Sequence, residues 1–263
     1  MTCEPRQGAP DACAICGGRA IDCLPETESD EYKFFRCGGC RFVFLHPMPS
    51  REELSKLYEE NTYGVEEARY EKSNSRLRRS TVRSIKLLPY IFRKNVLDVG
   101  CGGGFMVEAM RLFGARASGI DVNPTAIAYA KKRFRRNQFF CEHFDAFAGR
   151  KLSYDFIFCS ELMEHIGDLR HMMAFFNKSM KVGGYIYVTT PDYGHPKTPK
   201  ILTEWDVYVP PYHVQFFNFE NARILFNRYG FEMVRKVPRR KPGLHFIARK
   251  QRDLPAGEAP GLQ

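Results

Sequence analysis

The 263-residue chain lacks any run of 18 apolar residues, so no segment is predicted to cross a membrane as a helix. Its start also lacks the basic-then-apolar pattern of a secretory signal peptide. The sequence shows no internal repeat. Its 44% apolar and 27% charged residues match globular proteins, which excludes a disordered chain. We therefore expect a cytoplasmic protein with one large domain, or one domain plus a small module.

The cysteines are numerous for such a chain and are spaced like metal ligands. Nine cysteines in an expected reducing compartment favour metal binding over disulfides. Two C-x2-C pairs, separated by 20 residues, allow four thiolates to meet one tetrahedral ion and leave no position for water. We predict a structural zinc ion in a ribbon over residues 1–48, with a pair of redox dithiols as the alternative. The ligands are Cys13, Cys16, Cys37 and Cys40.

The next segment, residues 49–92, is predicted to be a helical linker or cap. Ser50 and Glu53 form a capping-box pattern that begins a helix through about residue 58. A long polar helix over 66–88 is expected to end before Pro89. The C-terminal tail, residues 251–263, is expected to be disordered because it is rich in proline, glycine and polar residues.

Residues 93–250 alternate between strand and helix patterns. This alternation predicts an α/β fold, a Rossmann-like doubly wound parallel sheet of seven strands. After the third strand, the expected strands lie near 154–159, 185–190, 231–237 and 244–249, and the expected helices near 105–113, 124–134, 168–180 and 219–229.

A glycine loop follows the first strand, 95–99, and precedes a helix. Gly100, Gly102 and Gly104 depart from the dinucleotide pattern G-x-G-x-x-G because position 105 is Phe. Asp98 would face negative charge in a pyrophosphate site, whereas it can face the ammonium group of S-adenosylmethionine. Asp121 ends the second strand, where its carboxylate can accept both ribose hydroxyl protons. The loop therefore predicts a nucleoside-binding site.

Three motifs in this order resemble class I S-adenosylmethionine-dependent methyltransferases: Val96–Gly104, Gly119–Pro124 and Tyr154–His165. The zinc pattern followed by Phe42–Ser50 resembles a bacterial branch whose members often methylate sugars, lipids or secondary metabolites. The resemblance covers about residues 93–250 and implies S-adenosylmethionine as cofactor.

The resemblance also implies where this cofactor lies. The glycines would contact its methionine part and Asp121 its ribose. Asp145 and Ala146 would lie near the adenine amino group, with Glu142 as a competing acid. The full implied set is Asp98, Gly100, Cys101, Gly102, Gly104, Asp121, Val122, Asp145, Ala146, Ser160 and Glu161.

The segment after the fourth strand argues against methylation of a nucleobase amine. Such methyltransferases usually carry Asn/Asp-Pro-Pro-Tyr there, and Pro210–Tyr212 instead follows Val209 much later. Glu161, Glu164 and His165 would share one face of a helix. They could hold a divalent cation such as magnesium, as in the quinone-pathway O-methyltransferases that the segment resembles. The interpretation we favour is that Glu161 contacts the cofactor while Glu164 and His165 shape the pocket.

Residues 191–218 form a long aromatic connection, which is typical of a functional loop. We predict that it covers the acceptor pocket, with Trp205 and Tyr212 as substrate lid. The Pro-x-His ending at His213 resembles an active-site element of similar enzymes. His213, or else His165, is therefore predicted to act as general base, with packing or surface roles as the alternative.

The charge is uneven, with 40 Lys/Arg against 30 Asp/Glu. The stretches 69–94, 131–136 and 235–250 contain 21 basic residues and a single acid. They are either solvated faces or contacts to an anionic partner.

The leading hypothesis is O-methylation of a small-molecule, sugar or lipid-linked acceptor, which could be anionic. One alternative is an RNA methyltransferase whose zinc ribbon and basic helices track phosphates, although nucleic acid is a disfavoured partner. The other is a non-catalytic module that binds zinc and a nucleoside. No motif identifies the acceptor or the oligomeric state.

Overall fold

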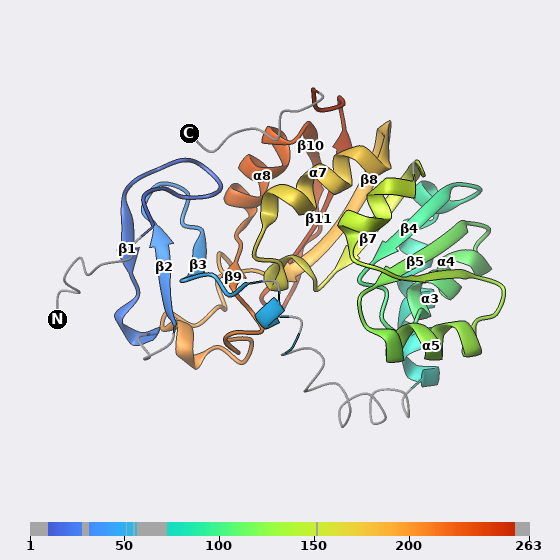
Figure 1. Cartoon of the computed structure of the whole chain (residues 1–263), viewed down its shortest axis with the longest axis horizontal. Coiled ribbons are helices and arrows are strands. Elements are labelled where there is room, and N and C mark those ends of the chain that lie inside the picture. Colours follow the sequence, from blue (N-terminus) through green and yellow to red (C-terminus); the bar gives the residue numbers. More distant parts are fainter. Residues whose placement is uncertain are drawn as a thin grey trace.

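The computed structural model describes residues 10–27, 32–50, 52–54, 56, 73–150 and 152–255, which form two sheets (Figure 1). The large sheet has, in spatial order, β10 (Phe231–Lys236), β11 (Gly243–Lys250), β8 (Met180–Pro191), β7 (Tyr154–Ser160), β4 (Asn95–Val99), β5 (Arg116–Asp121) and β6 (Gln138–Cys141). In the described part of the chain, no helix is long and apolar enough to span a membrane.

The seven-stranded sheet confirms the predicted α/β fold. Neighbouring strands from β6 to β8 run parallel, whereas β11 runs antiparallel to both β8 and β10. The sheet is therefore mixed rather than wholly parallel as expected. The reason is the short connection 237–242, which can join β10 to β11 only as antiparallel neighbours.

Helices cover both faces of this sheet, and hydrophobic clusters fill the space between the layers. On one face lie α3 (Ser73–Ile91), α4 (Phe105–Leu112) and α5 (Pro124–Arg133). On the other lie α6 (Phe144–Phe147), α7 (Leu169–Ser179) and α8 (Phe219–Arg228). This is the layering of a doubly wound fold, with loops gathered at the carboxyl ends of the parallel strands.

The helix expected to end before Pro89 instead continues to Ile91. Proline lacks the N–H that would bond the carbonyl of Ile85. Ile85 is 53% exposed, so water can satisfy that carbonyl, and the buried side chains of Leu87 and Ile91 hold the last turn on the sheet. The predicted residues 66–72 lie outside the described residues.

The glycine pair at 183–184 lies inside a strand. Helix α7 already ends at Ser179, and β8 begins at Met180. The pairing of β7 with β8 is irregular between Tyr154 and Phe156, so the extra residues of β8 bulge there. A Cβ at Gly184 would lie 2.9 Å from the carbonyl oxygen of Lys181, which explains the need for glycine at this bulge.

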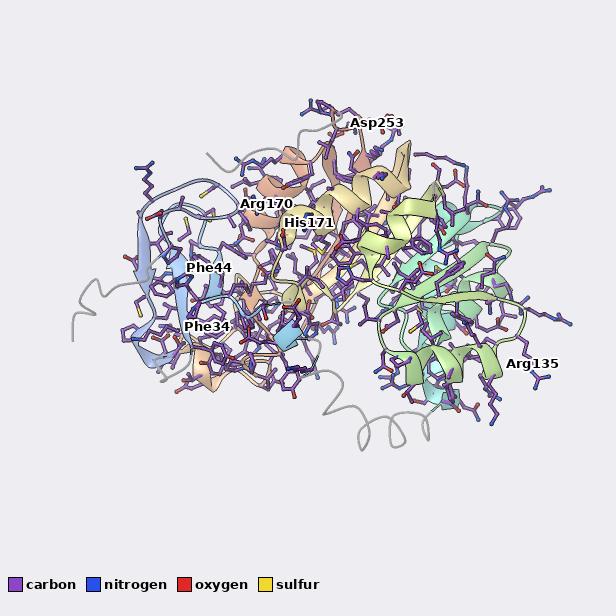
Figure 2. The ribbon with its side chains drawn as sticks, in the orientation of Figure 1. Phe34, Phe44, Arg135, Arg170, His171 and Asp253 are labelled. Carbon is purple, nitrogen blue, oxygen red and sulfur yellow. The ribbon has the colours of Figure 1, made fainter. Side chains whose placement is uncertain are left out.

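The tail is ordered further than expected. The buried Lys250 ammonium donates to the Asp253 carboxylate at 2.6 Å, and the Leu254 N–H donates to the Asn177 side chain at 3.1 Å. Residues 251–255 therefore pack against the α7 end of the molecule, where Figure 2 labels Asp253. The predicted disorder of 256–263 lies outside the described residues.

The small sheet joins the N-terminal module to the rest of the chain. It orders β1 (Ile21–Cys23), β2 (Lys33–Cys37), β3 (Val43–His46) and β9 (Gln215–Phe216). Phe34 and Phe44 pack on its two sides (Figure 2). The fourth strand of this sheet comes from residues 215–216. The N-terminal module, residues 1–48, therefore packs together with a segment from the C-terminal half of the chain.

The capping box between this module and α3 has the predicted geometry. The Ser50 N–H donates to the Glu53 carboxylate at 2.7 Å, and the Glu53 N–H donates to Ser50 Oγ at 3.2 Å. The predicted end of that helix, near residue 58, lies outside the described residues.

Candidate functional site

The glycine loop connects the end of β4 to the start of α4. Gly100, Gly102 and Gly104 have φ angles of 75°, 48° and 78°, a region that other residues rarely adopt. A Cβ at Gly104 would lie 2.6 Å from the Phe139 ring, whereas one at Gly102 would meet no atom within 4 Å. The backbone at Gly102 therefore faces open space that a ligand can approach closely.

Asp121, at the end of β5, lies directly beside this loop. Its Oδ2 accepts the Gly102 N–H at 2.7 Å, and its Oδ1 accepts the Asn123 N–H at 2.9 Å. Burial raises the pKa of this carboxyl, although both N–H donors oppose the shift. The next residue, Val122, is 55% exposed and offers an apolar surface at the same edge. A ribose at Asp121 and a base beside Val122 suit this arrangement.

Asp98 is the most strongly perturbed acid near the loop. It is 3% exposed, and burial together with the negative charge of Asp121 raises its pKa to about 8. A cationic ligand group would stabilise its ionised form. Cys101 is also buried, and its sulfur lies 2.7 Å from where a Cβ on Gly119 would be. The Cys101 side chain thus packs against β5.

The two acids considered for the adenine end differ in their surroundings. The Glu142 carboxylate is ion-paired with Arg150. Asp145 and Ala146 lie in the short helix α6, whose N-terminus His143 caps by accepting the Asp145 N–H. Asp145 Oδ2 lies 3.2 Å from His143 Nδ1, and its side chain is 37% exposed against 25% for Glu142. Because Asp145 is the more exposed acid and faces an imidazole rather than a guanidinium, it is the better candidate for an adenine contact.

A hydrogen-bonded chain crosses the carboxyl ends of β7 and β8. Arg83 of α3 donates to Ser160 Oγ at 3.3 Å, Ser160 and Thr189 hydroxyls lie 2.6 Å apart, and Thr189 donates to Glu161 Oε1 at 2.6 Å. Glu161 has a φ of 53°, a strained value for a residue other than glycine that is frequent at functional sites.

Arg83 and Thr189 were missed by the sequence analysis. Arg83 sits in a run of basic residues that resembled a solvated face. Its spacing was a usable signal, because Arg83 lies four residues before the buried Leu87 and therefore on the inner face of α3.

A second polar cluster lies on the opposite side of β8. The Glu164 side chain is fully buried, and its Oε2 accepts the Thr190 hydroxyl at 2.8 Å. Its Oε1 has no hydrogen-bond partner among the described residues and lies 3.9 Å from His165 Nε2. Burial and the charge of Glu161 raise the pKa of Glu164 to about 8.

The two histidines proposed as bases come together here. The His165 and His213 rings are 4.6 Å apart. His165 Nδ1 lies 2.7 Å from the Tyr212 carbonyl oxygen, and His213 Nδ1 lies 2.7 Å from that of Val207. A carbonyl can only accept, so the Nδ1–H donates and His213 Nε2 is left able to take a proton. Burial lowers the pKa of His213, which favours its neutral form.

The predicted grouping of Glu161 with Glu164 and His165 on one helix face is wrong. Only Met163–His165 is helical, as a single 3-10 turn, and Glu161 precedes it in the left-handed conformation. Its carboxylate is bound to Thr189 instead. Ligand atoms of Glu164, His165 and His213 lie within 4.8 Å of one another, so the aromatic connection 191–218 supplies the third member of any metal site here.

The aromatic connection wraps over this cluster, but its two predicted lid residues behave differently. Trp205 is 5% exposed, with its ring 5.4 Å from that of Phe216, so it packs inside the connection rather than lining a cavity. Tyr212 is half-buried and supplies the carbonyl that orients His165. Its side chain remains the candidate for acceptor contact.

The four predicted zinc ligands cluster at the end of the small sheet. Their sulfurs lie within 4.8 Å of one another, with 3.6 Å between Cys13 and Cys40 and 3.5 Å between Cys16 and Cys37. Four sulfurs about 2.3 Å from one zinc would be about 3.8 Å apart, so the spacing fits a tetrahedral ion. The Ile15 and Gly18 N–H groups each donate to a cysteine sulfur at 3.4 Å, which stabilises thiolates.

This cluster is bonded directly to the rest of the fold. The Cys40 carbonyl accepts from the side chains of Asn218 and Asn221, which also form the capping box of α8. The lid continues into β9, whose Phe216 and Gln215 pair with Val43 and Phe44 of β3. The cysteine cluster and the histidine cluster are thus connected through β9.

Comparison with known sequences agrees with this geometry. A family model described as a methyltransferase domain matches residues 70–236. The ubiquinone biosynthesis O-methyltransferase of Erwinia tasmaniensis is 35% identical over 108 residues, which cover 38% of this chain and 43% of the relative. That of Coxiella burnetii is 34% identical over 101 residues, covering 37% and 43%. The chain therefore spans less than half the length of these curated relatives.

Solved structures share the fold. A magnesium protoporphyrin IX methyltransferase from Synechocystis, with SAH bound, gives a TM-score of 0.57 at 12% identity, covering 75% of this chain and all of that one. A SAM-dependent methyltransferase from Archaeoglobus fulgidus gives 0.54 at 18% identity, covering 66% and 94%. At these identities the likeness concerns the fold alone.

Proposed function

Because the chain belongs to the methyltransferase-domain family, matched over residues 70–236, we propose that it methylates an oxygen atom of a small-molecule, sugar or lipid-linked acceptor. The methyl donor would be S-adenosylmethionine. The similarity to ubiquinone biosynthesis O-methyltransferases supports an oxygen acceptor.

We propose a binding mode in which each polar part of the cofactor meets a matching group. Asp121 accepts the ribose hydroxyl protons, and the open backbone at Gly102 lies against the methionine part. The amino-acid end carries an ammonium and a carboxylate. Asp98 suits the ammonium, and Arg83, whose charge acts on Asp98, suits the carboxylate.

The observation that best supports acceptor chemistry is the convergence of Glu164, His165 and His213. In the proposed reaction the acceptor oxygen attacks the methyl carbon in line with the sulfonium. The O–CH3 bond forms as the S–CH3 bond breaks, and S-adenosylhomocysteine leaves. His213 Nε2 takes the hydroxyl proton and later returns it to solvent. Alignment of the two substrates and exclusion of water supply most of the acceleration.

A metal-assisted variant of this reaction has its own support in the buried Glu164 Oε1. A carboxylate and two imidazoles suit a transition-metal ion or zinc better than the magnesium suggested by the sequence. Such an ion would lower the pKa of an acceptor hydroxyl. Separately, we propose that the four cysteines hold a structural zinc that takes no part in the reaction.

The cofactor proposal is tested by calorimetry. Wild type should bind S-adenosylmethionine, and Asp121→Ala should weaken binding by roughly 10–100-fold, because two hydrogen bonds of about 0.7–1.4 kcal/mol each are lost. Glu142→Ala is the matched control, since Glu142 is paired with Arg150, and it should change affinity less than threefold. Equal affinity of wild type and Asp121→Ala would contradict the proposed binding mode.

The acceptor proposal is tested by transfer of a labelled methyl group to catechols, sugar hydroxyls, carboxylates and RNA. Label should enter an oxygen of one small-molecule class. RNA labelling, with affinity that falls steeply as salt rises, would instead support the RNA alternative. Cofactor binding with no turnover on any class would support a non-catalytic module.

A further inference from the structure

The outer face of α3 carries an apolar stripe that nothing in the described residues covers. Ser84, Leu87 and Ile91 face the sheet and are buried. On the opposite side Val82, Ile85, Leu88 and Phe92 are 51%, 53%, 37% and 55% exposed. Spaced by three or four residues, these side chains form one continuous line. Val82, Ile85 and Leu88 lie on α3, and Phe92 directly follows its last residue. Single exposed apolar residues are ordinary, but a line of four along this helix and its end indicates a contact surface.

Basic side chains flank this stripe without any compensating acid. Residues 73–94 contain seven Lys/Arg and no Asp/Glu. Arg83 is directed inward to Ser160. Arg79 and Lys86, seven residues apart on the helix, follow one edge of the stripe. The helix is thus amphipathic on its solvent side, with apolar and cationic side chains in parallel rows.

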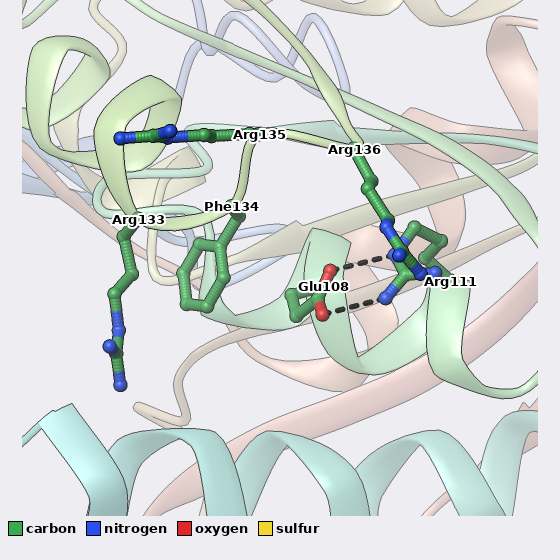
Figure 3. A pocket seen from close by; sticks show the side chains of 6 residues that line it. All are labelled: Glu108, Arg111, Arg133, Phe134, Arg135 and Arg136. Carbon is green, nitrogen blue, oxygen red and sulfur yellow. Dashed lines mark hydrogen bonds and ion pairs between the residues drawn. The ribbon is translucent and has the colours of Figure 1, made fainter.

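An arginine-lined pocket lies next to the same helix. It encloses about 360 Å³ between Glu108, Arg111, Arg133, Phe134, Arg135 and Arg136 (Figure 3). Glu108 is bound by Arg111 at 2.8 Å and is the one acid among the residues that line the pocket, so Arg133 at the end of α5 and Arg135 and Arg136 after it leave the pocket with excess positive charge. Leu77 of α3 packs against the hydrophobic cluster that also contains Phe134, so the helix and one wall of the pocket share that cluster.

The far end of the stripe also borders α4. A Cβ on Gly114 would lie 3.1 Å from the Phe92 ring, and Leu112, beside Arg111, is 55% exposed. The apolar stripe and the arginine pocket therefore belong to one surface, which we name the α3 surface: Val82, Ile85, Leu88 and Phe92 with Arg79 and Lys86 of α3 and the cations of residues 131–136.

We propose that the α3 surface docks on an anionic lipid bilayer. The apolar stripe would enter the interfacial layer, and the cations would meet lipid phosphates, the pocket holding one headgroup. A second copy of the chain fits less well because two such basic faces repel each other. RNA would match the cations but leave the aliphatic side chains without a partner. The inference does not depend on the methyl acceptor.

The experiment is co-sedimentation of the full chain with vesicles of phosphatidylcholine alone or with one quarter phosphatidylglycerol. Wild type should bind the anionic vesicles at least tenfold more tightly, and binding should weaken as salt rises from 0.05 to 0.5 M. The double variant Val82→Glu/Ile85→Glu should lose at least tenfold in binding. Both positions are exposed and glutamate is a good helix former, so the fold should persist.

The matched control is Val182→Glu/Val234→Glu, which adds the same two charges at valines 56% and 44% exposed on β8 and β10. It should bind vesicles within twofold of wild type. Thermal melting and calorimetry with S-adenosylmethionine verify that both double variants are folded.

Three outcomes would overturn the proposal. The first is that wild type does not bind anionic vesicles at low salt. The second is that Val82→Glu/Ile85→Glu binds them as tightly as Val182→Glu/Val234→Glu does. A concentration-dependent dimer, seen by light scattering and lost in the α3 variant, would show that a second copy covers the surface. If the protein binds RNA but not vesicles, and Val82→Glu/Ile85→Glu leaves the RNA affinity unchanged, the basic residues of this surface bind nucleic acid instead.

Discussion

Asp98 is a buried carboxyl group whose charge should depend on the ligand. Its pKa of about 8 means that most molecules carry a proton there at neutral pH. A bound ammonium group favours the ionised form, so binding of S-adenosylmethionine should release protons. Affinity should therefore rise from pH 6 to about pH 8 and then level off. Calorimetry at pH 7 in buffers of different ionisation enthalpy measures the released protons.

The variant Asp98→Asn removes this titration. It should bind more weakly at pH 8 and show no rise in affinity between pH 6 and 8. A rise that persists in Asp98→Asn would assign the proton to another group. The stability of the free protein depends on pH in the opposite direction. Because the pKa of Asp98 is raised in the folded state, the folded protein is favoured when Asp98 is protonated. The contribution of Asp98 to stability is complete below about pH 4 and is lost as pH rises through about 8.

The geometry of the glycine loop could be predicted from the sequence, but the hydrogen bond between Arg83 and Ser160 could not. Gly100, Gly104 and Asp121 follow from a local pattern of strand, turn and helix, which fixes backbone geometry within a few residues. Arg83 reaches Ser160 across 77 residues of sequence, because α3 crosses the end of β7. No local pattern encodes such a crossing.

At the scale of single elements, the question is which side chain removes the proton of the acceptor hydroxyl. The proposed lid, residues 192–214, carries the candidate base His213. His213→Ala should lower turnover by roughly 10²–10⁴ if Nε2 is the base. Its affinity for S-adenosylmethionine should stay within about twofold, because the proposed cofactor contacts lie on other elements. Initial rates at saturating cofactor, with and without a chelator, separate this mechanism from metal assistance.

The matched control is His195→Ala. His195 lies on the same connection and is half-buried, with its Nε2 3.2 Å from the Arg239 carbonyl oxygen, and its variant should keep turnover within a factor of two. Full activity in His213→Ala would exclude the histidine base. If the chelator stops wild type while about one zinc stays bound, the Glu164 cluster holds a metal. A wild-type rate that does not change with chelator would contradict the metal-assisted mechanism.

The order of elements was predictable because buried strands and amphipathic helices repeat with their own periods. The departures have tertiary causes. Pro89 stays within α3 because the carbonyl it cannot bond is exposed, and Gly183–Gly184 form a bulge because β7 and β8 differ in length there. Met163–His165 form a single 3-10 turn, which is too short for residues at i, i+3 and i+4 to share a face. The spacing in the sequence therefore grouped Glu161 with Glu164 and His165 incorrectly.

At the scale of the whole molecule, the N-terminal ribbon is a support for the lid. Leu45 of β3 donates its N–H to the Val214 carbonyl at 2.8 Å, and Val214 in turn donates to the Glu164 carbonyl at 2.9 Å. Val214, which directly follows His213, is therefore bonded both to β3 of the ribbon and to Glu164. The pairing joins residues 43–46 to 214–216, and a separation of about 170 residues is beyond any sequence pattern.

This connection predicts that loss of zinc acts at a distance. Cys37→Ser removes one thiolate, so the ribbon should lose its metal and β3 should release β9. Turnover should fall at least tenfold because the lid no longer holds His213, while affinity for S-adenosylmethionine should change less than threefold. Cys23→Ser, outside the four-sulfur cluster, is the matched control and should keep about one zinc per chain and wild-type turnover.

Hydrogen exchange follows the same connection at the level of individual amides. In Cys37→Ser, protection should fall at 43–46 and at 214–216, whereas the core strands β4 and β5 should keep theirs, because their hydrogen bonds lie within the large sheet. Loss of protection limited to the ribbon, with turnover intact, would mean that the lid holds His213 through Val207 and Glu164 alone. If the amides of β4 lose protection as well, the ribbon stabilises the whole fold. The fall in turnover would then result from general destabilisation and would not support a specific effect on the lid.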